Sequence, residues 1–306
     1  MAHEFTIDIF IDCKGVGNMG KVFVSGAAGN VGGAAAASLC AAGVEVVAGV
    51  RAEGRGDALK AMGAEVRPFD FADPDSMVAA MAGCDRVFLA LPLVEGMTRL
   101  GHLAVEAMKA AGVEYVVRSS GYAASSDAHW RLGREHGMVD QFVEDSGIAF
   151  TTLRPNTFMQ NFSTVMAPMV KGGTLTLPEK DAAVSYIDVR DVGDCAARLF
   201  QDNAGFENGF YALTGPEGLT LSDVAATLSE LDGVSVEYQP VEEAAYVAGL
   251  LEMGTPKWNV DMLVSLTRVV KLGMMGNVTR AVEHVSGKPA RTFAEFAREH
   301  ASAWAE

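Results

Sequence analysis

The chain has 306 residues, of which 49 % are apolar and 21 % are charged, a composition that suits a large globular core and argues against global disorder. Its 39 acidic and 24 basic residues give a formal net charge of −15. This charge disfavours nucleic acid and anionic membrane surfaces as partners. An anionic ligand must therefore be held by local groups.

The remaining bulk features point to a cytoplasmic protein. The four cysteines lie far apart without a C-x-x-C pair, and the six histidines are scattered, so we predict free thiols and no metal site. Residues 1–18 contain three acidic residues and no apolar core flanked by basic residues, which disfavours a signal peptide. No stretch is long and apolar enough to predict a transmembrane span.

From Lys21 onward, short β-branched runs alternate with runs rich in alanine and leucine. The predicted strands are Lys21–Ser25, Val44–Val50, Glu65–Phe69, Arg86–Leu91, Tyr115–Ser119 and Ala149–Leu153. The predicted helices are Val31–Ala42, Asp57–Met62, Pro74–Met81 with Asp73 as N-cap, Met97–Ala111 and Glu135–Asp145. This alternation predicts an α/β fold: a doubly wound parallel sheet with helices on both faces and a Rossmann core.

After Leu153 the pattern changes. Predicted helices cover Asn156–Val170, Asp191–Gln201, the segment from Thr220 to Leu231, Val241–Met253, Asn259–Leu272 and the segment from Thr292 towards Trp304. Two of these begin with capping boxes, Thr220 with Asp223 and Thr292 with Glu295. Short strands are expected at Thr174–Leu177, Ala183–Ile187 and Val234–Gln239. We interpret this part as a smaller lobe built on the end of the sheet.

Two glycine patterns compete near the start, GVGNMG at residues 15–20 and GAAGNVG at residues 26–32. A dinucleotide-binding turn must follow a strand and open a helix, because the helix N-terminus supplies the N–H groups and dipole that bind the pyrophosphate. The first pattern is followed by a strand, whereas the second lies between a strand and a helix. We therefore predict a nicotinamide dinucleotide on the second pattern, with contacts from Gly26, Ala28, Gly29, Asn30 and Val31.

The next two strand ends suggest which dinucleotide binds. A strand that ends beside the adenosine ribose carries Asp or Glu in a typical NAD site. Here the strand ends at Arg51, whose guanidinium suits a 2′-phosphate, so NADP(H) is favoured over NAD(H). Asp70 follows the third strand, where the adenine edge should lie; alternatively, it caps the next helix.

Ligands of open α/β sheets bind outside the carboxyl ends of the strands. The fourth, fifth and sixth strands place candidate cofactor contacts there, namely Leu91, Pro92, Ser119, Pro155, Asn156 and Phe158. Soft apolar side chains follow, and they suit a flat aromatic ligand: Phe158, Met159, Phe162, Met166 and Met169, with Tyr246, Met253 and Trp258 as candidates to close the pocket. Alternatively, these side chains form an ordinary apolar stripe that packs in the core.

These pieces together resemble the NmrA-like branch of the atypical short-chain dehydrogenase/reductases. The matching segments are residues 22–32 (VFVSGAAGNVG), 50–51 (VR), 118–121 (RSSG), 145–155 (DSGIAFTTLRP) with 156–161, and 187–191 (IDVRD). The resemblance implies a Rossmann core with a small C-terminal substrate lobe. We accordingly divide the chain into an extension at 1–20, an NAD(P)-binding domain at 21–160 and an α+β substrate lobe at 161–306, with 183–201 returning to the core.

One departure from related reductases concerns the acid–base pair. Their Tyr-x-x-x-Lys motif follows the fifth strand, and here the two positions fall on Leu132 and His136. The remaining candidates for catalysis are His136, Tyr122 and Ser120. His136, with a reference pKa of about 6.5, could hydrogen-bond the nicotinamide ribose or relay a proton; alternatively, it faces solvent.

The resemblance includes NAD(P)H-dependent reductases of quinones, dyes and alkaloids, and also non-catalytic sensors that bind the dinucleotide and a protein partner. Quinones, dye cations and iminium ions accept hydride without a strong protein acid. We therefore predict an NADPH-dependent reductase of a small aromatic or conjugated electrophile. The alternatives are an NADP(H)-sensing regulator and an isomerase or epimerase of the same fold, and a homodimer is a further expectation.

Overall fold

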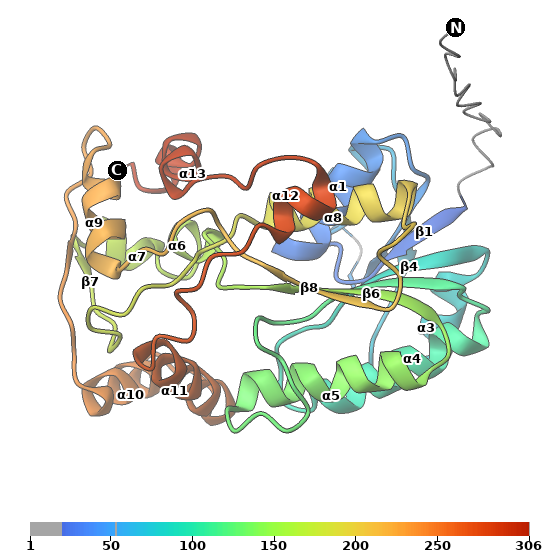
Figure 1. The fold of residues 1–306 in the computed structure, drawn as a ribbon, viewed down its shortest axis with the longest axis horizontal. Coiled ribbons are helices and arrows are strands. Elements are labelled where there is room, and N and C mark those ends of the chain that lie inside the picture. Colours follow the sequence, from blue (N-terminus) through green and yellow to red (C-terminus); the bar gives the residue numbers. More distant parts are fainter. Residues whose placement is uncertain (1–19, 53, 306) are drawn as a thin grey trace, which may run out of the picture.

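A parallel β-sheet forms the centre of the computed structural model, which describes residues 20–52 and 54–305 (Figure 1). Its seven strands in the described residues are β1 (Lys21–Val24), β2 (Val46–Val50), β3 (Glu65–Pro68), β4 (Cys84–Ala90), β5 (Tyr115–Ser119), β6 (Ala149–Pro155) and β8 (Gly209–Leu213). They lie in the order β3-β2-β1-β4-β5-β6-β8, and every neighbouring pair is parallel. The predicted doubly wound Rossmann fold is confirmed, and its switch point lies between β1 and β4.

Helices cover both faces of the sheet (Figure 1). One face carries α1 (Asn30–Ala41), α8 (Val189–Gln201) and α12 (Ala281–Ser286), and α8 packs on the other two. The other carries α3 (Pro74–Met81), α4 (Met97–Ala110) and α5 (Arg131–Asp145). The short α2 (Asp57–Ala61) connects β2 with β3. Asp73 caps α3 as predicted, because its carboxylate accepts hydrogen bonds from the amides of Asp75 and Ser76.

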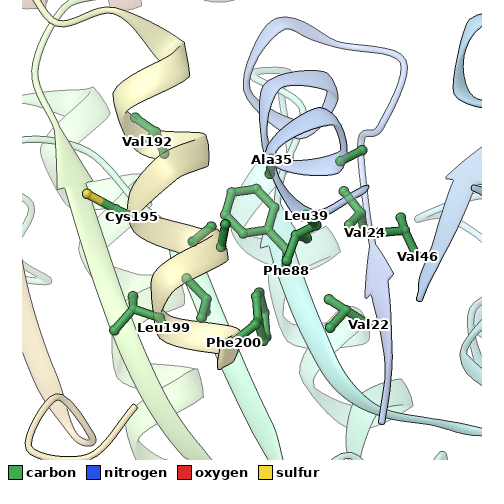
Figure 2. Close-up of a cluster of buried hydrophobic side chains, with 14 of the residues drawn as sticks. Val22, Val24, Ala35, Leu39, Val46, Phe88, Val192, Cys195, Leu199 and Phe200 are labelled. Carbon is green, nitrogen blue, oxygen red and sulfur yellow. The ribbon is translucent and has the colours of Figure 1, made fainter. Parts of the chain in front are cut away.

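Figure 2 shows the apolar core between the sheet and the α1–α8 pair. It contains Val22, Val24, Val46 and Phe88 from the strands, Ala35 and Leu39 from α1, and Val192, Cys195, Leu199 and Phe200 from α8. The two helices approach closely at Gly193, where a Cβ would lie 2.6 Å from the carbonyl oxygen of Ala34. Helix α8, which comes after residue 160 in the sequence, therefore completes the nucleotide-binding half of the molecule.

The other elements form a second lobe beyond the carboxyl ends of the strands (Figure 1). They are α6 (Gln160–Ser163), α7 (Ala167–Lys171), β7 (Thr174–Leu175), α9 (Leu221–Ser229), β9 (Glu237–Tyr238), α10 (Glu243–Glu252), α11 (Lys257–Lys271), α13 (Phe293–Glu299) and the 3-10 turn η1 (Ala301–Ala303). Strands β7 and β9 pair in parallel, and both predicted capping boxes are present. A separate apolar cluster fills this lobe.

Several sequence predictions in this region are wrong. The helix expected at Asn156–Val170 starts only at Gln160, since Phe158 forms a bridge with Ile187, and it is divided into α6 and α7 where Thr164 leaves the helical conformation. Residues 183–187 make only isolated bridges, because their partners are irregular segments. Strand β8 and helix α12 were not predicted, and α5 begins at Arg131 rather than at Glu135.

Two regions complete the description. The predicted extension and the rejected glycine pattern lie outside the described residues apart from Gly20, which directly precedes β1. In the described part of the chain, no helix combines the length and apolar character that crossing a membrane requires. The division at residue 160 stays a prediction, although α8, β8 and α12 return to the sheet after it.

The closest backbone approach in the glycine turn gives a stability prediction. A Cβ at Gly32 would lie 2.3 Å from the carbonyl oxygen of Gly26, so Gly32→Ala should lower the free energy of unfolding by about 1–3 kcal/mol. Gly249→Ala is the matched control, because Gly249 is also helical and a Cβ there would meet nothing within 4 Å. It should be neutral or stabilise by up to about 1 kcal/mol. Equal unfolding free energies for the two variants in urea would contradict this account.

Candidate functional site

The turn between β1 and α1 presents an open helix N-terminus. Gly26 adopts a left-handed conformation with φ of +60°, and the amide of Gly29 donates to its carbonyl oxygen at 2.8 Å. Gly29 is the N-cap, and no side chain of the described residues caps the helix or places an acid in its first turn. Ala28 and Asn30 are exposed beside it. The free N–H groups and the positive end of the helix dipole suit a phosphate.

Arg51 and Asp70 lie at the next two strand ends. Arg51 directly follows β2, is exposed, and makes no ion pair within the described residues, so its guanidinium is available to an anion. Asp70 is also exposed, and its Oδ1 accepts a hydrogen bond from the amide of Ala72 at 2.9 Å. Since Asp73 caps α3, the alternative role of Asp70 as the cap is wrong; it closes the turn before that helix.

A cavity of about 380 Å³ opens beyond the carboxyl ends of β4, β5 and β6 and extends to the second lobe. Nine of the predicted site residues line it: Val31, Leu91, Ser119, Ser120, Tyr122, His136, Pro155, Asn156 and Phe158. The others do not line it but lie at the ends of β1 to β4: Gly26, Ala28, Gly29, Asn30, Arg51, Asp70 and Pro92. The structure thus separates the predicted residues into a glycine-turn group and a cavity group.

The cavity walls on the lobe side are mostly apolar. Of the side chains expected at the mouth, Phe158, Met166 and Tyr246 line the cavity. Met159 and Phe162 are core residues, as the alternative interpretation held, and Met253 is 67 % exposed. Trp258 stacks near Arg131 instead. The remaining wall includes residues that were not predicted, among them Trp130, Met262, Leu266 and Met275.

A buried ion pair lies behind the polar end of the cavity. Arg118 of β5 is completely buried, and its Nε is 3.8 Å from Oδ1 of Asp140 on α5, which is 3 % exposed. Arg118 also donates to the backbone carbonyls of Ser119 and Leu89. Burial lowers the pKa of Arg118 to about 10, and the charge of Asp140 opposes that shift. The guanidinium is therefore charged at neutral pH.

Two of the predicted polar residues are already hydrogen-bonded. Ser120 donates its hydroxyl proton to Oδ2 of Asp140 at 2.9 Å. The amide of Asn156 donates to Ser185 and to the carbonyl of Met275, and its oxygen accepts from the amide of Thr157. Ser120 can still accept a hydrogen bond from a ligand, whereas the side chain of Asn156 is occupied in joining the two lobes.

His136 faces the cavity and the buried arginine, so the interpretation that it simply faces solvent is wrong. Its Nδ1 lies 3.2 Å from a guanidinium nitrogen of Arg118, which can only donate, so the ring proton is on Nε2. Burial and the positive charge of Arg118 lower the pKa of His136 to about 3. The expected titration near 6.5 is corrected: His136 is a neutral donor at physiological pH. A lysine at this position would place a second cation beside Arg118.

Glu179 is a cavity residue that sequence reasoning missed. It lies in the turn after β7 and is only 9 % exposed, although the neighbouring Lys180 and Asp181 face solvent. Burial raises the pKa of its carboxyl to about 7. The local sequence LPEKD has no periodicity and gives no signal for an inward glutamate. Arg118 was detectable in principle, because it is a charged residue inside a strand that is otherwise suited to burial.

Comparison with known proteins places this geometry in a family. The model of the NmrA-like family matches residues 18–296. The chain belongs to the NmrA-like family. The family prediction from the glycine turn and the later motifs is thus confirmed.

The relatives include proteins named for reductase activities. The NAD(P)H azoreductase of Xenophilus azovorans is 33 % identical over 283 residues, which cover 92 % of this chain and 99 % of that protein. The structure of the NADPH-dependent quinone oxidoreductase of Escherichia coli, complexed with NADPH, has a TM-score of 0.80 and 28 % identity over 91 % of this chain and 99 % of that chain. The triphenylmethane reductase of Citrobacter sp. shares the fold, with a TM-score of 0.80 and 22 % identity over 92 % of this chain and 99 % of that chain.

The buried pair predicts a large stability effect in this NmrA-like protein. Asp140→Asn should lower the free energy of unfolding by about 3 kcal/mol or more, because it leaves the charge of Arg118 buried and unpaired. Glu144→Gln is the control, since Glu144 is an exposed carboxylate on the same helix and should change stability by at most about 0.5 kcal/mol. Urea denaturation of both variants checks the difference, and an Asp140→Asn loss below about 1 kcal/mol would contradict it.

Proposed function

We propose that the protein is an NADPH-dependent reductase that transfers hydride to a small aromatic or conjugated electrophile of the quinone or dye type. The observation that carries this proposal is the composition of the cavity. Its polar end contains Leu132 and His136, the positions of the Tyr/Lys pair in related enzymes, and its walls are apolar. Such a cavity accepts a flat conjugated molecule. It lacks the Tyr/Lys pair that usually protonates an alkoxide.

The residues fit an extended dinucleotide along the carboxyl ends of the strands. The N-terminus of α1 with the turn from Gly26 to Val31 would hold the pyrophosphate. Arg51 would bind the 2′-phosphate and Asp70 would lie at the adenine. Toward the nicotinamide, the contacts would come from the following strand ends: Leu91, Pro92, Ser119, His136, Pro155, the backbone of Asn156 and Phe158. The names of two relatives support this choice of cofactor: one is an NAD(P)H azoreductase and the other an NADPH-dependent quinone oxidoreductase.

When bound, NADPH supplies the hydride. The protein residues would position the reactants: Nε2–H of His136 would donate to the nicotinamide ribose, and the oxygen of Ser120 would accept a hydrogen bond at the same end. Arg118 keeps His136 in this tautomer. The apolar residues Phe158, Met166 and Leu266 line the cavity and would exclude water from a bound acceptor.

A cofactor oxidation assay tests the function. Purified protein should consume the absorbance of NADPH in the presence of neutral quinones and cationic dyes, because both accept hydride without the missing Tyr/Lys pair. It should oxidise secondary alcohols with NADP⁺ slowly or not at all. Iminium compounds belong in the same panel. NADPH binding without turnover of any acceptor would favour a regulator that binds a protein partner, and robust alcohol oxidation would contradict the proposed chemistry.

Cofactor selectivity tests the assignment of Arg51. The parent should bind NADPH more tightly than NADH, and Arg51→Ala should reduce that preference by about 10- to 100-fold, because a charge-assisted hydrogen bond contributes about 1.5–3 kcal/mol. Lys60→Ala removes another exposed cation, located on α2, and should leave the preference unchanged. Titration of both cofactors against the three proteins gives the comparison. Equal affinity of the parent for the two cofactors would overturn the assignment.

The location of the protein, its partners and its oligomeric state stay predictions. Its negative charge and its cysteine usage favour the cytoplasm and a small-molecule substrate, and disfavour nucleic acid and membranes as partners. A homodimer is likewise a prediction.

A further inference from the structure

The lobe end of the cavity contains one acidic side chain, Glu179, among its described lining residues. The surrounding wall is apolar and aromatic, with Leu177, Val184, Tyr186 and Tyr246 close in the lining. Within the described residues, no hydrogen bond or ion pair reaches the Glu179 carboxyl. The side chain is only 9 % exposed and borders the cavity, so its carboxyl is within reach of a ligand there.

Four other polar side chains of the cavity are poor proton donors, which leaves Tyr122 as the competitor of Glu179 for this role. The hydroxyl proton of Ser120 is directed to Asp140. His136 is neutral, since its Nδ1 faces Arg118, and it has no second proton to release at neutral pH. Burial raises the pKa of Tyr246 to about 12 and that of Tyr186 above its ordinary value. The reduced form of a neutral acceptor nevertheless requires a proton.

We propose that Glu179 is the proton donor of this reductase, delivering the proton to the heteroatom that gains negative charge when a neutral conjugated substrate accepts hydride. The proposal rests on the proposed function. In the step, the hydride bonds to one end of a conjugated system, and the electron pair of the π bond moves to an oxygen or nitrogen at the other end. The O–H bond of the Glu179 carboxylic acid breaks, the proton bonds to that heteroatom, and the carboxylate regains a proton from water.

The surroundings support a carboxyl that is protonated in part at neutral pH. The titratable groups packed around it are Tyr186 before α8, Tyr238 on β9 and Tyr246 on α10. Burial raises the pKa of each, and the charge of the Glu179 carboxylate raises it further. No cation of the described residues is among these groups. Tyr238 donates its hydroxyl to the carbonyl of Leu177 at 2.9 Å and so does not stabilise the carboxylate. Because the pKa of Glu179 is about 7, its carboxyl is well suited to transfer a proton near neutral pH.

A comparison of neutral and cationic acceptors tests the proposal. Menadione and a neutral aminoazobenzene dye need a proton after accepting hydride, whereas the cation of crystal violet becomes a neutral product without one. Glu179→Gln should slow the single-turnover oxidation of NADPH by the neutral acceptors by about tenfold or more. With crystal violet its rate should stay within about twofold of the parent. Asp181→Asn, which removes an exposed carboxylate from the same turn, should leave both reactions unchanged.

The pH profile supplies a readout that a structural role would not change. With the neutral acceptors, the parent rate should be constant below about pH 7 and fall tenfold per pH unit above it, because the acid form is required. Glu179→Asp should keep an inflection, and Glu179→Gln should lose it. Thermal unfolding and NADPH affinity of each variant report whether the fold and the cofactor site are intact.

Several results would overturn the proposal. If Glu179→Gln lost the same fraction of its rate with neutral and cationic acceptors, the substitution would have a general effect on the cavity. A loss with crystal violet alone would indicate a counter-ion for cationic substrates. If Tyr122→Phe removed the pH inflection and Glu179→Gln kept it, Tyr122 would be the donor. A parent that turns over none of the three acceptors would contradict the proposed function itself and is thereby distinguished from these outcomes.

Discussion

The buried charge of Arg118 is the constraint on which the organisation of the site depends. A guanidinium removed from water is stable only beside an anion and hydrogen-bond acceptors, and here Asp140 and two backbone carbonyls provide them. Asp140 must therefore face the sheet, which fixes the rotation of α5 about its axis. His136 lies four residues earlier and so occupies the same face of that helix, beside the cavity. The charge of Arg118 thus faces the imidazole, while Asp140, which Arg154 also binds at 3.0 Å, orients the hydroxyl of Ser120.

The cavity depends equally on the way in which the second lobe is attached. Asn156, at the end of β6, donates hydrogen bonds to Ser185 and to the carbonyl of Met275, and these contacts join three distant segments. Within the lobe, Trp304 donates a hydrogen bond to the carbonyl of Phe162 at 2.9 Å and holds the C-terminal turn on α6. Because the polar end belongs to the sheet and the apolar walls belong to the lobe, a ligand in the cavity contacts both at once. The division between a reactive end and a substrate-recognising wall follows from that arrangement.

Sequence reasoning predicted best where the pattern is local. The alternating elements from Lys21 to Asp145 have strong periodicity, and the glycine turn carries its context on both sides, so both were predictable. Strand β8 is short and partly exposed at the edge of the sheet, and its sequence GFYAL has no alternation of apolar and polar residues. Helix α5 begins early because the hydroxyl of Ser265, far along the chain, accepts the amide proton of Arg131. The tautomer of His136 and the inward direction of Glu179 likewise depend on tertiary contacts that no local pattern records.

The pairing of α1 with α8 has a consequence for how the chain acquires its structure. The apolar face of α1 is complete only when α8 covers it, yet most of the sheet and part of the lobe are synthesised between them. On the ribosome, the nucleotide-binding half must therefore wait with an uncovered apolar surface until the later helix emerges. Contacts between segments so distant in sequence slow folding, since a long loop must close before they form. A chain shortened before α8 would consequently expose an aggregation-prone surface.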